Sequence, residues 1–216
     1  MTGGSSGIGA ALAEALVQKG AEVYSLDIQE PTTRIDHINY IVANLTIETE
    51  VESAIKQLPE DIGILILNAG VMRRGTIFAS SEEDYDLLMD TNLKGAWLTL
   101  KHAKPKLKPD ATIVQMSSGH ALHPEANPGI YTITKKAVTA MAEALALTCP
   151  EFDVKVVYPG PVLTPLLLEG RDEKDKKRIA GIGQKPELIA RKIVELIESS
   201  HKSLMFVRDT NEYVFK

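Results

Sequence analysis

Cysteine and aromatic residues are scarce in this sequence. Cys149 is the single cysteine among 216 residues, and Phe, Trp and Tyr together make up 5% of the chain. One cysteine excludes an internal disulfide and a cysteine-rich metal site, so we expect a buried structural thiol and no metal. No apolar run approaches the roughly 18 residues that span a membrane, and no signal peptide is recognisable. We therefore expect a soluble, cytoplasmic protein without a membrane partner.

Positive charge is also in short supply, because 24 Lys and Arg residues stand against 29 Asp and Glu, for a formal net charge of −5. No basic cluster is interleaved with aromatic side chains, so we expect no nucleic-acid partner. The apolar fraction of 44% is typical of an α/β protein with enough material for a core. No repeat, low-complexity tract or linker divides the chain, so residues 1–216 are expected to form a single domain.

Short β-rich runs alternate with longer amphipathic stretches along the chain. This pattern is typical of a doubly wound parallel sheet with helices on both faces. The expected strands are 22–26, 39–42, 64–67, 112–116, 154–158 and 203–207. The expected helices are 7–19, 48–57, 82–104, 130–148 and 186–199, with Gly20 suited to a helix C-cap and Pro186 to a first helical turn.

A Tyr-x-x-x-Lys motif, formed by Tyr131 and Lys135, is the most informative signal for function. Residues four apart share one helical face, so the ammonium group can lie near the phenol. A phenol is a poor acid-base catalyst at neutral pH, and a neighbouring cation favours its ionised form. Ser118, at the end of an expected strand, could hold a substrate carbonyl while Tyr131 transfers the proton. The same spacing also occurs on exposed helix faces, so the motif needs support from other signals.

The second signal is the glycine-rich opening, residues 2–9, which runs directly into an apolar helix. Glycines let the backbone turn tightly and approach a pyrophosphate, which would lie at the positive end of the helix. A flexible N-terminus is the alternative reading. Asp27, at the end of the next strand, favours binding, because a carboxylate there accepts both hydroxyls of an adenosine ribose and repels a 2′-phosphate. Neither Ser6 nor Ile28 is an arginine that could receive that phosphate, so NAD is expected over NADP.

Taken together, these motifs resemble those of the short-chain dehydrogenase/reductase family, in the family's order and over nearly the whole chain. Residues 2–9 match the family's Thr-Gly-x-x-x-Gly-x-Gly, and Ser118, Tyr131 and Lys135 match its catalytic serine, tyrosine and lysine. Three further matches are Asn68-Ala69-Gly70 to Asn-Ala-Gly, Asn92 to the asparagine of the long helix, and residues 159–164 to Pro-Gly-x-Val-x-Thr.

The resemblance implies a Rossmann-like, NAD(P)-dependent oxidoreductase that acts on a small alcohol or carbonyl substrate. It implies that Tyr131 is the general acid/base and that Lys135 lowers its pKa and bonds the nicotinamide ribose. Ser118 would orient the substrate oxygen, and Asn92 would hold a water in a proton relay. The residues implied to contact the cofactor are Gly3, Ser5, Ser6, Gly7, Ile8, Gly9, Asp27, Asn44, Leu45, Asn68, Ala69, Gly70, Tyr131, Lys135, Pro159, Val162 and Thr164.

The resemblance also implies a homodimer or homotetramer, assembled through the expected helices 82–104 and 130–148. Their outward faces are expected to carry Leu98, Met141, Ala144 and Leu145. Such an apolar surface exceeds what a monomer usually leaves exposed.

Two positions depart from the family pattern. Asn44 stands where an aspartate is usual, and its amide can still hydrogen-bond an adenine edge. Only Met1 precedes Thr2, where family members have an apolar first strand in the centre of the sheet. We expect either a shortened chain, with 211–215 as a short tail, or a C-terminal segment, 212–216, that fills the central position.

The borders of the expected cleft are less specific. The segment between Thr164 and Pro186 is short and charged, and it is expected to be a solvated loop or helix, or else a lid that offers leucines. His120, His123, Arg73 and Arg74 are either surface residues or contacts to an anionic or polar substrate.

Three functions are compatible with this sequence. The first is an NAD-dependent alcohol dehydrogenase or carbonyl reductase, the second a non-catalytic dinucleotide-binding or scaffolding protein, and the third an epimerase or dehydratase that uses the same site. The presence of all four residues Asn92, Ser118, Tyr131 and Lys135 favours the first. The sequence does not identify the substrate.

Overall fold

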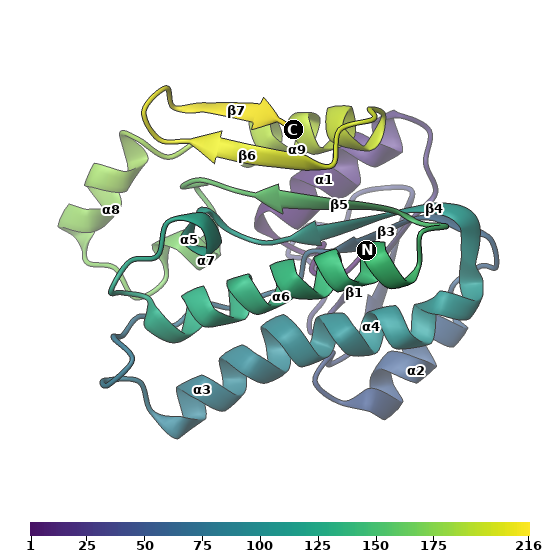
Figure 1. The fold of residues 1–216 in the computed structure, drawn as a ribbon, viewed down its shortest axis with the longest axis horizontal. Coiled ribbons are helices and arrows are strands. Elements are labelled where there is room, and N and C mark those ends of the chain that lie inside the picture. The colour runs from purple at the N-terminus through teal and green to yellow at the C-terminus, as the bar shows by residue number, and fades with distance from the viewer.

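A sheet that is parallel except at one edge runs through the computed structural model, which describes residues 1–216, and helices cover both faces (Figure 1). The strands are β1 (Val23–Asp27), β2 (Ile38–Val42), β3 (Ile62–Leu67), β4 (Leu107–Met116), β5 (Asp153–Tyr158), β6 (Ser203–Val207) and β7 (Glu212–Phe215). The helices are α1 (Gly7–Gln18), α2 (Glu48–Lys56), α3 (Glu82–Met89), α4 (Gly95–Ala103), α5 (Gly119–Leu122), α6 (Gly129–Thr148), α7 (Pro165–Leu168), α8 (Glu173–Ala180) and α9 (Pro186–Ile197). The predicted α/β fold with a parallel central sheet is confirmed.

Strands β3, β4, β5 and β6 lie side by side in parallel, and β1 pairs in parallel with β2. The central strands are almost entirely buried along their second halves, because helices cover both sheet faces; this explains their continuous apolar sequence. The core therefore has two main parts. One contains Leu12 of α1 with Ile189 and Ile193 of α9, and the other contains Val51 of α2 with Leu98 of α4.

Thr2 joins β1 and β3 into one sheet. It forms isolated parallel bridges to Leu26 of β1 and Leu67 of β3. Its N–H donates to the carbonyl of Ile66 at 2.9 Å, and the N–H of Gly3 donates to the carbonyl of Leu26 at 2.8 Å. The start of the chain thus lies in the position where the resemblance implies a first strand, and the strand order becomes β2, β1, Thr2, β3, β4, β5, β6, β7.

The C-terminal segment does not fill that central position. Residues Glu212–Phe215 form β7, which pairs antiparallel with β6 at the far edge of the sheet. The permuted-strand alternative is therefore wrong, and so is the expectation of a short packed tail. The segment forms a strand because Tyr213 and Phe215 alternate with exposed residues and pack against the core from the edge.

The single long helix predicted for 82–104 is interrupted. Helices α3 and α4 are separated by a π-helical turn, Asp90–Lys94, and a short 3₁₀ turn, Lys104–Lys106, follows α4. A π-helical turn inserts an extra residue into the helical ladder and turns one side chain inward. Here the inward residue is Asn92, which is 1% exposed.

The charged segment after Thr164 contains two short helices, α7 and α8, which agrees with the helix alternative given for it. Two other expectations need correction. Cys149 is half-buried rather than fully buried. Leu98 belongs to the core and not to an outward face of α4. No helix in the structure combines the length and the apolar character that crossing a membrane would require.

Candidate active site

The sheet ends on one side in a large cavity of about 930 Å³. Its walls come from the segments that follow the carboxyl ends of β1, β3, β4 and β5, together with the start of α1. In open parallel sheets, ligands bind at this edge, where neighbouring connections leave in opposite directions. Every site residue predicted from the sequence lines this cavity except Ser5 and Asn92.

The glycine-rich turn adopts the conformation that its sequence suggests. Gly3 has a φ of +69°, in the left-handed region that favours glycine. A Cβ on Gly9 would lie 1.9 Å from the carbonyl oxygen of Gly3, so only glycine fits where α1 meets the turn. No side chain caps the first turn of α1, whose N-cap residue is Ser6. This end of the cavity therefore fits an anionic group such as a pyrophosphate.

Asp27 faces the same part of the cavity from the end of β1. One of its carboxylate oxygens accepts a 3.0 Å hydrogen bond from the backbone N–H of Ser5. That bond connects the carboxylate to the glycine-rich turn. Ser5 therefore supports Asp27 without lining the cavity itself. The neighbouring Ile28 is 66% exposed and offers no cation for a phosphate.

Asn68 links the glycine-rich turn to the end of β3. Its amide nitrogen donates to the carbonyl oxygens of Thr2 at 3.2 Å and Gly3 at 2.8 Å. The hydroxyl of Thr2 in turn accepts from the backbone N–H groups of Asn68 and Ala69, both at 3.1 Å. These hydrogen bonds brace the glycine-rich turn against the end of β3.

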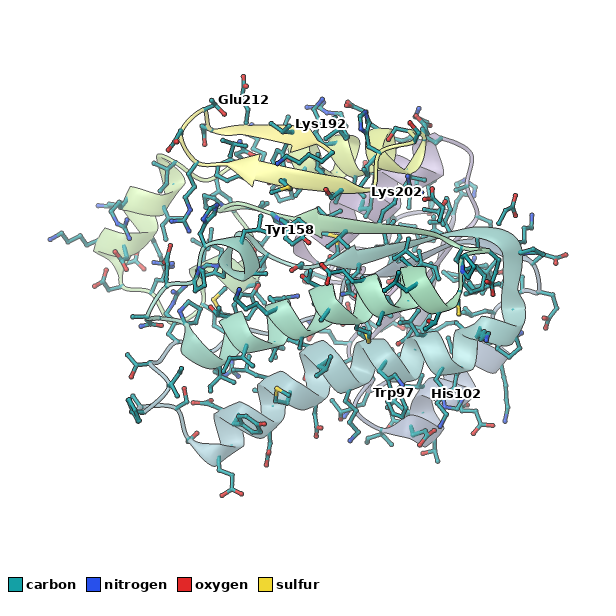
Figure 2. The ribbon with its side chains drawn as sticks, in the orientation of Figure 1. Trp97, His102, Tyr158, Lys192, Lys202 and Glu212 are labelled. Atoms are coloured by element: carbon teal, nitrogen blue, oxygen red, sulfur yellow. The ribbon has the colours of Figure 1, made fainter.

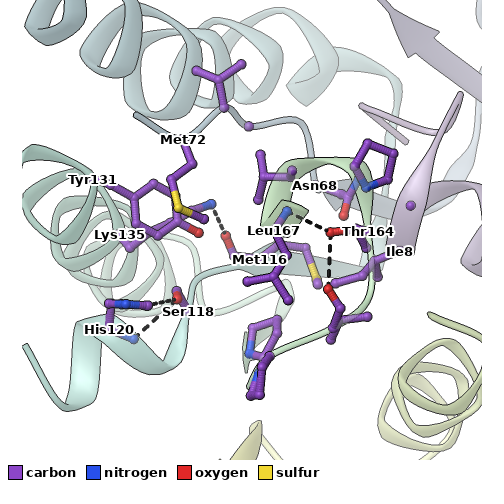
Figure 3. Close-up of a pocket in the computed structure, with 18 of the residues that line it drawn as sticks. Ile8, Asn68, Met72, Met116, Ser118, His120, Tyr131, Lys135, Thr164 and Leu167 are labelled. Carbon is purple, nitrogen blue, oxygen red and sulfur yellow. Dashed lines mark hydrogen bonds between the residues drawn. The ribbon is translucent and has the colours of Figure 1, made fainter. Parts of the chain in front are cut away.

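Tyr131 and Lys135 lie one turn apart on α6 and both line the cavity (Figure 3). The lysine Nζ lies 5.7 Å from the centre of the tyrosine ring and donates to the carbonyl oxygen of Met116 at 3.1 Å. Burial raises the pKa of Tyr131 to about 12, and the nearby hydroxyl of Ser118 opposes this rise. Burial also lowers the pKa of Lys135 to about 8. Desolvation is thus the largest influence on the pKa of Tyr131, and a lowering of that pKa by Lys135 stays a prediction.

Asn92 is held by three hydrogen bonds just outside the cavity wall. Its side-chain oxygen accepts from the N–H of Val71 at 2.8 Å, and its side-chain nitrogen donates to the carbonyl of Val71 and to the hydroxyl of Thr134, both at 3.0 Å. These contacts fasten the segment after β3 to α6. A role for Asn92 in a proton relay stays a prediction.

His120 belongs to the site more closely than the sequence indicated. Its Nδ1 lies 3.3 Å from the hydroxyl of Ser118, and its ring packs edge-on against Tyr131 at 5.9 Å (Figure 3). Burial lowers the pKa of His120, so the imidazole is neutral at pH 7. Its Nε2 lies 3.7 Å from the carboxylate of Glu125. The short Ser-Gly-His sequence after β4 was the available signal for this contact.

The remaining cavity wall mixes apolar side chains with arginines. Sequence reasoning missed most of these residues because they come from segments without a motif: Met72, Leu87, Ile179, Ile182, Phe206 and Arg208. Leu166 and Leu167 of α7 also line it, as the lid reading implied. His123 and Arg74 face the cavity, whereas Arg73 does not line it and pairs with Glu169 at 3.0 Å.

Comparison with known proteins identifies the pattern behind this geometry. The short chain dehydrogenase family pattern matches residues 1–175. Oxidoreductase UcpA of Escherichia coli (strain K12) is 32% identical over 185 residues, which cover 77% of this chain and 69% of UcpA. An uncharacterized oxidoreductase of Staphylococcus haemolyticus is 29% identical and covers 83% of this chain and 86% of its own.

Solved structures agree with the sequence comparison. A short chain dehydrogenase family protein from Francisella tularensis superposes with a TM-score of 0.82 at 28% identity, over 92% of this chain and 89% of its own. The aldohexose dehydrogenase of Thermoplasma acidophilum gives a TM-score of 0.82 at 28% identity, over 91% and 84%. A 3-ketoacyl-(acyl-carrier-protein) reductase from Brucella melitensis, solved with NADH, shares the fold at 24% identity and a TM-score of 0.80, over 91% and 88%.

Proposed function

This chain belongs to the short-chain dehydrogenase family of oxidoreductases, and from that membership we propose that it transfers a hydride between NAD(H) and a small alcohol or carbonyl compound. The observation that carries the proposal is the composition of one cavity. Ser118, Tyr131 and Lys135 line it together with the glycine-rich turn and Asp27. An acid-base group and a dinucleotide cradle in one enclosed space are what a hydride-transfer reaction needs.

The glycine-rich turn and Asp27 would hold a nicotinamide dinucleotide, which would supply or accept the hydride at the substrate carbon. Tyr131 exchanges the proton with the substrate oxygen, and its phenol, with a pKa raised to about 12, is protonated at neutral pH and can donate in the reducing direction. Ser118 holds the same oxygen by a hydrogen bond. His120, neutral and 3.3 Å from the Ser118 hydroxyl, orients that hydroxyl as a hydrogen-bond partner. Lys135 binds the nicotinamide ribose through its ammonium group.

The cofactor end of the cavity supports NAD over NADP. Asp27 can accept hydrogen bonds from the two ribose hydroxyls of adenosine and would repel a phosphate in place of the 2′-hydroxyl.

The aldohexose dehydrogenase and the 3-ketoacyl reductase act on different substrates by their names, so they support the reaction type rather than one substrate.

The test of the function is Tyr131→Phe. A panel of secondary alcohols and ketones is screened with the wild-type protein by NADH absorbance, and the variant is then assayed on the best substrate. We expect turnover to fall by at least about 100-fold, because only the proton donor is lost. The affinity for NAD, measured by calorimetry, should change less than about twofold because the ring remains.

Two results would contradict the proposal. The first is retention of more than about a tenth of wild-type activity by Tyr131→Phe, which would assign the proton to another group. The second is an absence of NAD-linked turnover across the whole panel with a protein that binds NAD. Thr132→Ser serves as the matched control. Thr132 neighbours Tyr131 on α6, and its hydroxyl donates to the carbonyl of Pro128 at 2.7 Å, a bond that serine can also form.

A further inference from the structure

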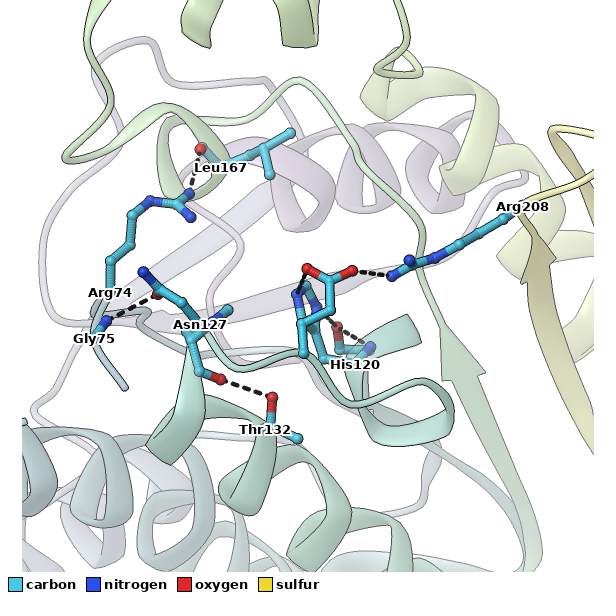
Figure 4. A network of polar contacts seen from close by, with 10 residues as sticks. Arg74, Gly75, His120, Asn127, Thr132, Leu167 and Arg208 are labelled. Atoms are coloured by element: carbon cyan, nitrogen blue, oxygen red, sulfur yellow. Dashed lines mark hydrogen bonds and ion pairs between the residues drawn. The ribbon is translucent and has the colours of Figure 1, made fainter. Parts of the chain in front are cut away.

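Arg74 stands out among the arginines of the cavity, because no carboxylate pairs with it. Arg171 and Arg178 both contact Asp175, each at 3.2 Å. Arg208 contacts Glu125 at 2.6 Å (Figure 4). Arg74 makes a single hydrogen bond, from Nη2 to the carbonyl oxygen of Leu167 at 3.2 Å. Its Nε is enclosed and has no hydrogen-bond partner.

The electrostatic setting makes this lone charge unfavourable without a ligand. Arg171 donates to the same Leu167 carbonyl at 2.9 Å, so two guanidinium groups converge on one neutral oxygen. Burial and the charge of Arg171 both lower the pKa of Arg74 from its usual value, and the charge of Asp175 opposes this lowering only in part. A partly desolvated cation beside a second cation is stabilised when an anion binds next to it.

The neighbouring Arg73 does have acidic partners, so the lack of a contacting carboxylate is particular to Arg74. Arg73 follows the same strand but turns away from the cavity, where it contacts Glu169 at 3.0 Å and Asp84 at 3.7 Å. Two consecutive arginines of identical chemistry therefore differ in one respect: one has acidic partners outside the cavity, and the other faces into the cavity with none.

We propose that the substrate carries a carboxylate and that Arg74 binds it, so that the cavity selects hydroxy acids or keto acids over neutral alcohols and ketones. This inference rests on the proposed function, since it names the substrate class of the same site. A planar guanidinium recognises a carboxylate through paired N–H donors, which gives both affinity and orientation. The apolar side chains Met72, Leu166 and Leu167 line the cavity as well and suit the hydrocarbon part of such a substrate.

A carboxylate fits this position better than a phosphate group does. Arg74 is the one cavity arginine that no carboxylate contacts, because Asp175 contacts both Arg171 and Arg178, and Glu125 contacts Arg208. A planar carboxylate matches the paired donors that a single guanidinium offers. A dianionic phosphate has more acceptor oxygens to satisfy, and Arg171, the second guanidinium at the Leu167 carbonyl, already donates to Leu167 and Asp175.

The experiment compares a graded series of straight-chain keto acids with their methyl esters, their parent ketones and phosphorylated ketones. The wild-type protein should favour an acid over its ester in kcat/KM by at least about tenfold. Arg74→Met should lower kcat/KM for the acid by on the order of 10- to 100-fold while leaving the ester within about twofold. Arg74→Lys keeps the charge without the planar donors and should restore part of the loss. Arg73→Met, the matched control, should behave as the wild type.

Three results would overturn the inference: equal use of acid and ester by the wild type, an equal loss for acid and ester in Arg74→Met, or a preference for the phosphorylated ketones. The second would assign Arg74 a purely structural contact with Leu167. Failure of the proposed function itself is distinguishable, since then no compound of any class is turned over. In that case, calorimetric titration of NAD-loaded protein with straight-chain dicarboxylates tests the carboxylate site directly. Binding that is lost in Arg74→Met but kept in Arg73→Met supports the site. No binding to the wild type, or binding that Arg74→Met keeps, refutes it.

Discussion

Burial alters the acid-base chemistry of both residues of the Tyr-x-x-x-Lys motif. Tyr131 and Lys135 are each 5% exposed, and burial shifts the pKa of each group in the direction that favours its neutral form. A lysine held at a pKa of about 8 destabilises the folded protein at neutral pH, because the unfolded chain binds the same proton more tightly. The site therefore carries an energetic cost that its function requires.

This cost predicts a pH-dependent stability difference. The pKa of Lys135 is lowered from 10.5 to about 8, so its contribution to stability is present above pH 10.5 and is lost as the pH falls toward 8. Lys135→Met should therefore be more stable than the wild type at pH 7, by roughly 1–3 kcal/mol, while losing NAD-linked turnover. The gap should narrow between pH 8 and 10 in urea unfolding.

The measurement should stop near pH 10, because the raised pKa of Tyr131 acts in the opposite direction above it. There the unfolded tyrosine ionises and the folded one does not, so stability falls with rising pH. A stability gap between wild type and Lys135→Met that does not change with pH would show that the lysine is not desolvated as its surroundings indicate.

Asp27 is predicted to decide which dinucleotide the protein binds. We expect the wild type to bind NAD more tightly than NADP by roughly 2–4 kcal/mol, through lost ribose hydrogen bonds and repulsion of the phosphate. Asp27→Ser combined with Ile28→Arg should reverse the order, because it removes the repulsion and adds a cation. Ile28→Arg alone is the control and should keep the preference for NAD. Equal dissociation constants of the wild type for both dinucleotides, measured by fluorescence titration, would refute this assignment.

At the scale of secondary-structure elements, two buried polar side chains connect segments that hydrophobic packing alone would leave loosely oriented. Asn92, turned inward by the π-helical turn between α3 and α4, holds the segment after β3. Lys155 of β5 is fully buried and donates to the carbonyls of Ser199 at 2.8 Å and His201 at 2.7 Å, just beyond the end of α9. It also contacts Asp153 at 2.9 Å.

Lys155→Met should destabilise the protein by about 2–4 kcal/mol, because the carbonyls of Ser199 and His201 and the Asp153 carboxylate lose a fully buried donor although the volume is kept. Lys202→Met is the matched control: Lys202 contacts the same Asp153, but its side chain is 68% exposed. The control should change stability by less than about 0.5 kcal/mol. Similar losses for the two variants in chemical denaturation would mean that burial does not distinguish the two lysines.

At the scale of the whole molecule, one apolar surface remains open. Trp97 of α4 is 50% exposed on the side facing away from the sheet (Figure 2), and it lines a shallow groove with Met89, Leu93 and Met141. The groove spans the two long helical segments through which the family resemblance implies assembly. The outward residues differ from those expected, since Leu98 points into the core and Trp97 takes its place.

We predict that the protein forms a homodimer or homotetramer through this groove. Trp97→Glu should shift the mass at micromolar concentration toward the monomer, because a buried carboxylate without a partner opposes association. Val42→Glu, on the edge strand β2, provides a control with the same added charge on a 54% exposed residue. Analytical ultracentrifugation checks both variants, and a monomeric wild type would contradict the prediction.

The sequence by itself determined the fold class, the positions of most strands and helices, and the residues that meet in the cavity. These features depend on local rules: alternation of apolar runs, a glycine-rich turn before a helix, and a spacing of four that places Tyr131 and Lys135 on one face. Because β-strand ends converge at one edge of a parallel sheet, motifs far apart in the chain could be assigned to one site.

The tertiary structure alone decided which polar groups have partners and which do not. Thr2 bridges two strands, and β7 lies at the sheet edge, because strand pairing depends on distant neighbours that no local pattern specifies. Arg73 and Arg74 are adjacent arginines that the sequence does not distinguish. Arg73 forms an ion pair with Glu169, whereas Arg74 faces the cavity without a contacting carboxylate. The raised pKa of Tyr131 has the same origin, because desolvation depends on the packed surroundings and not on a local spacing in the sequence.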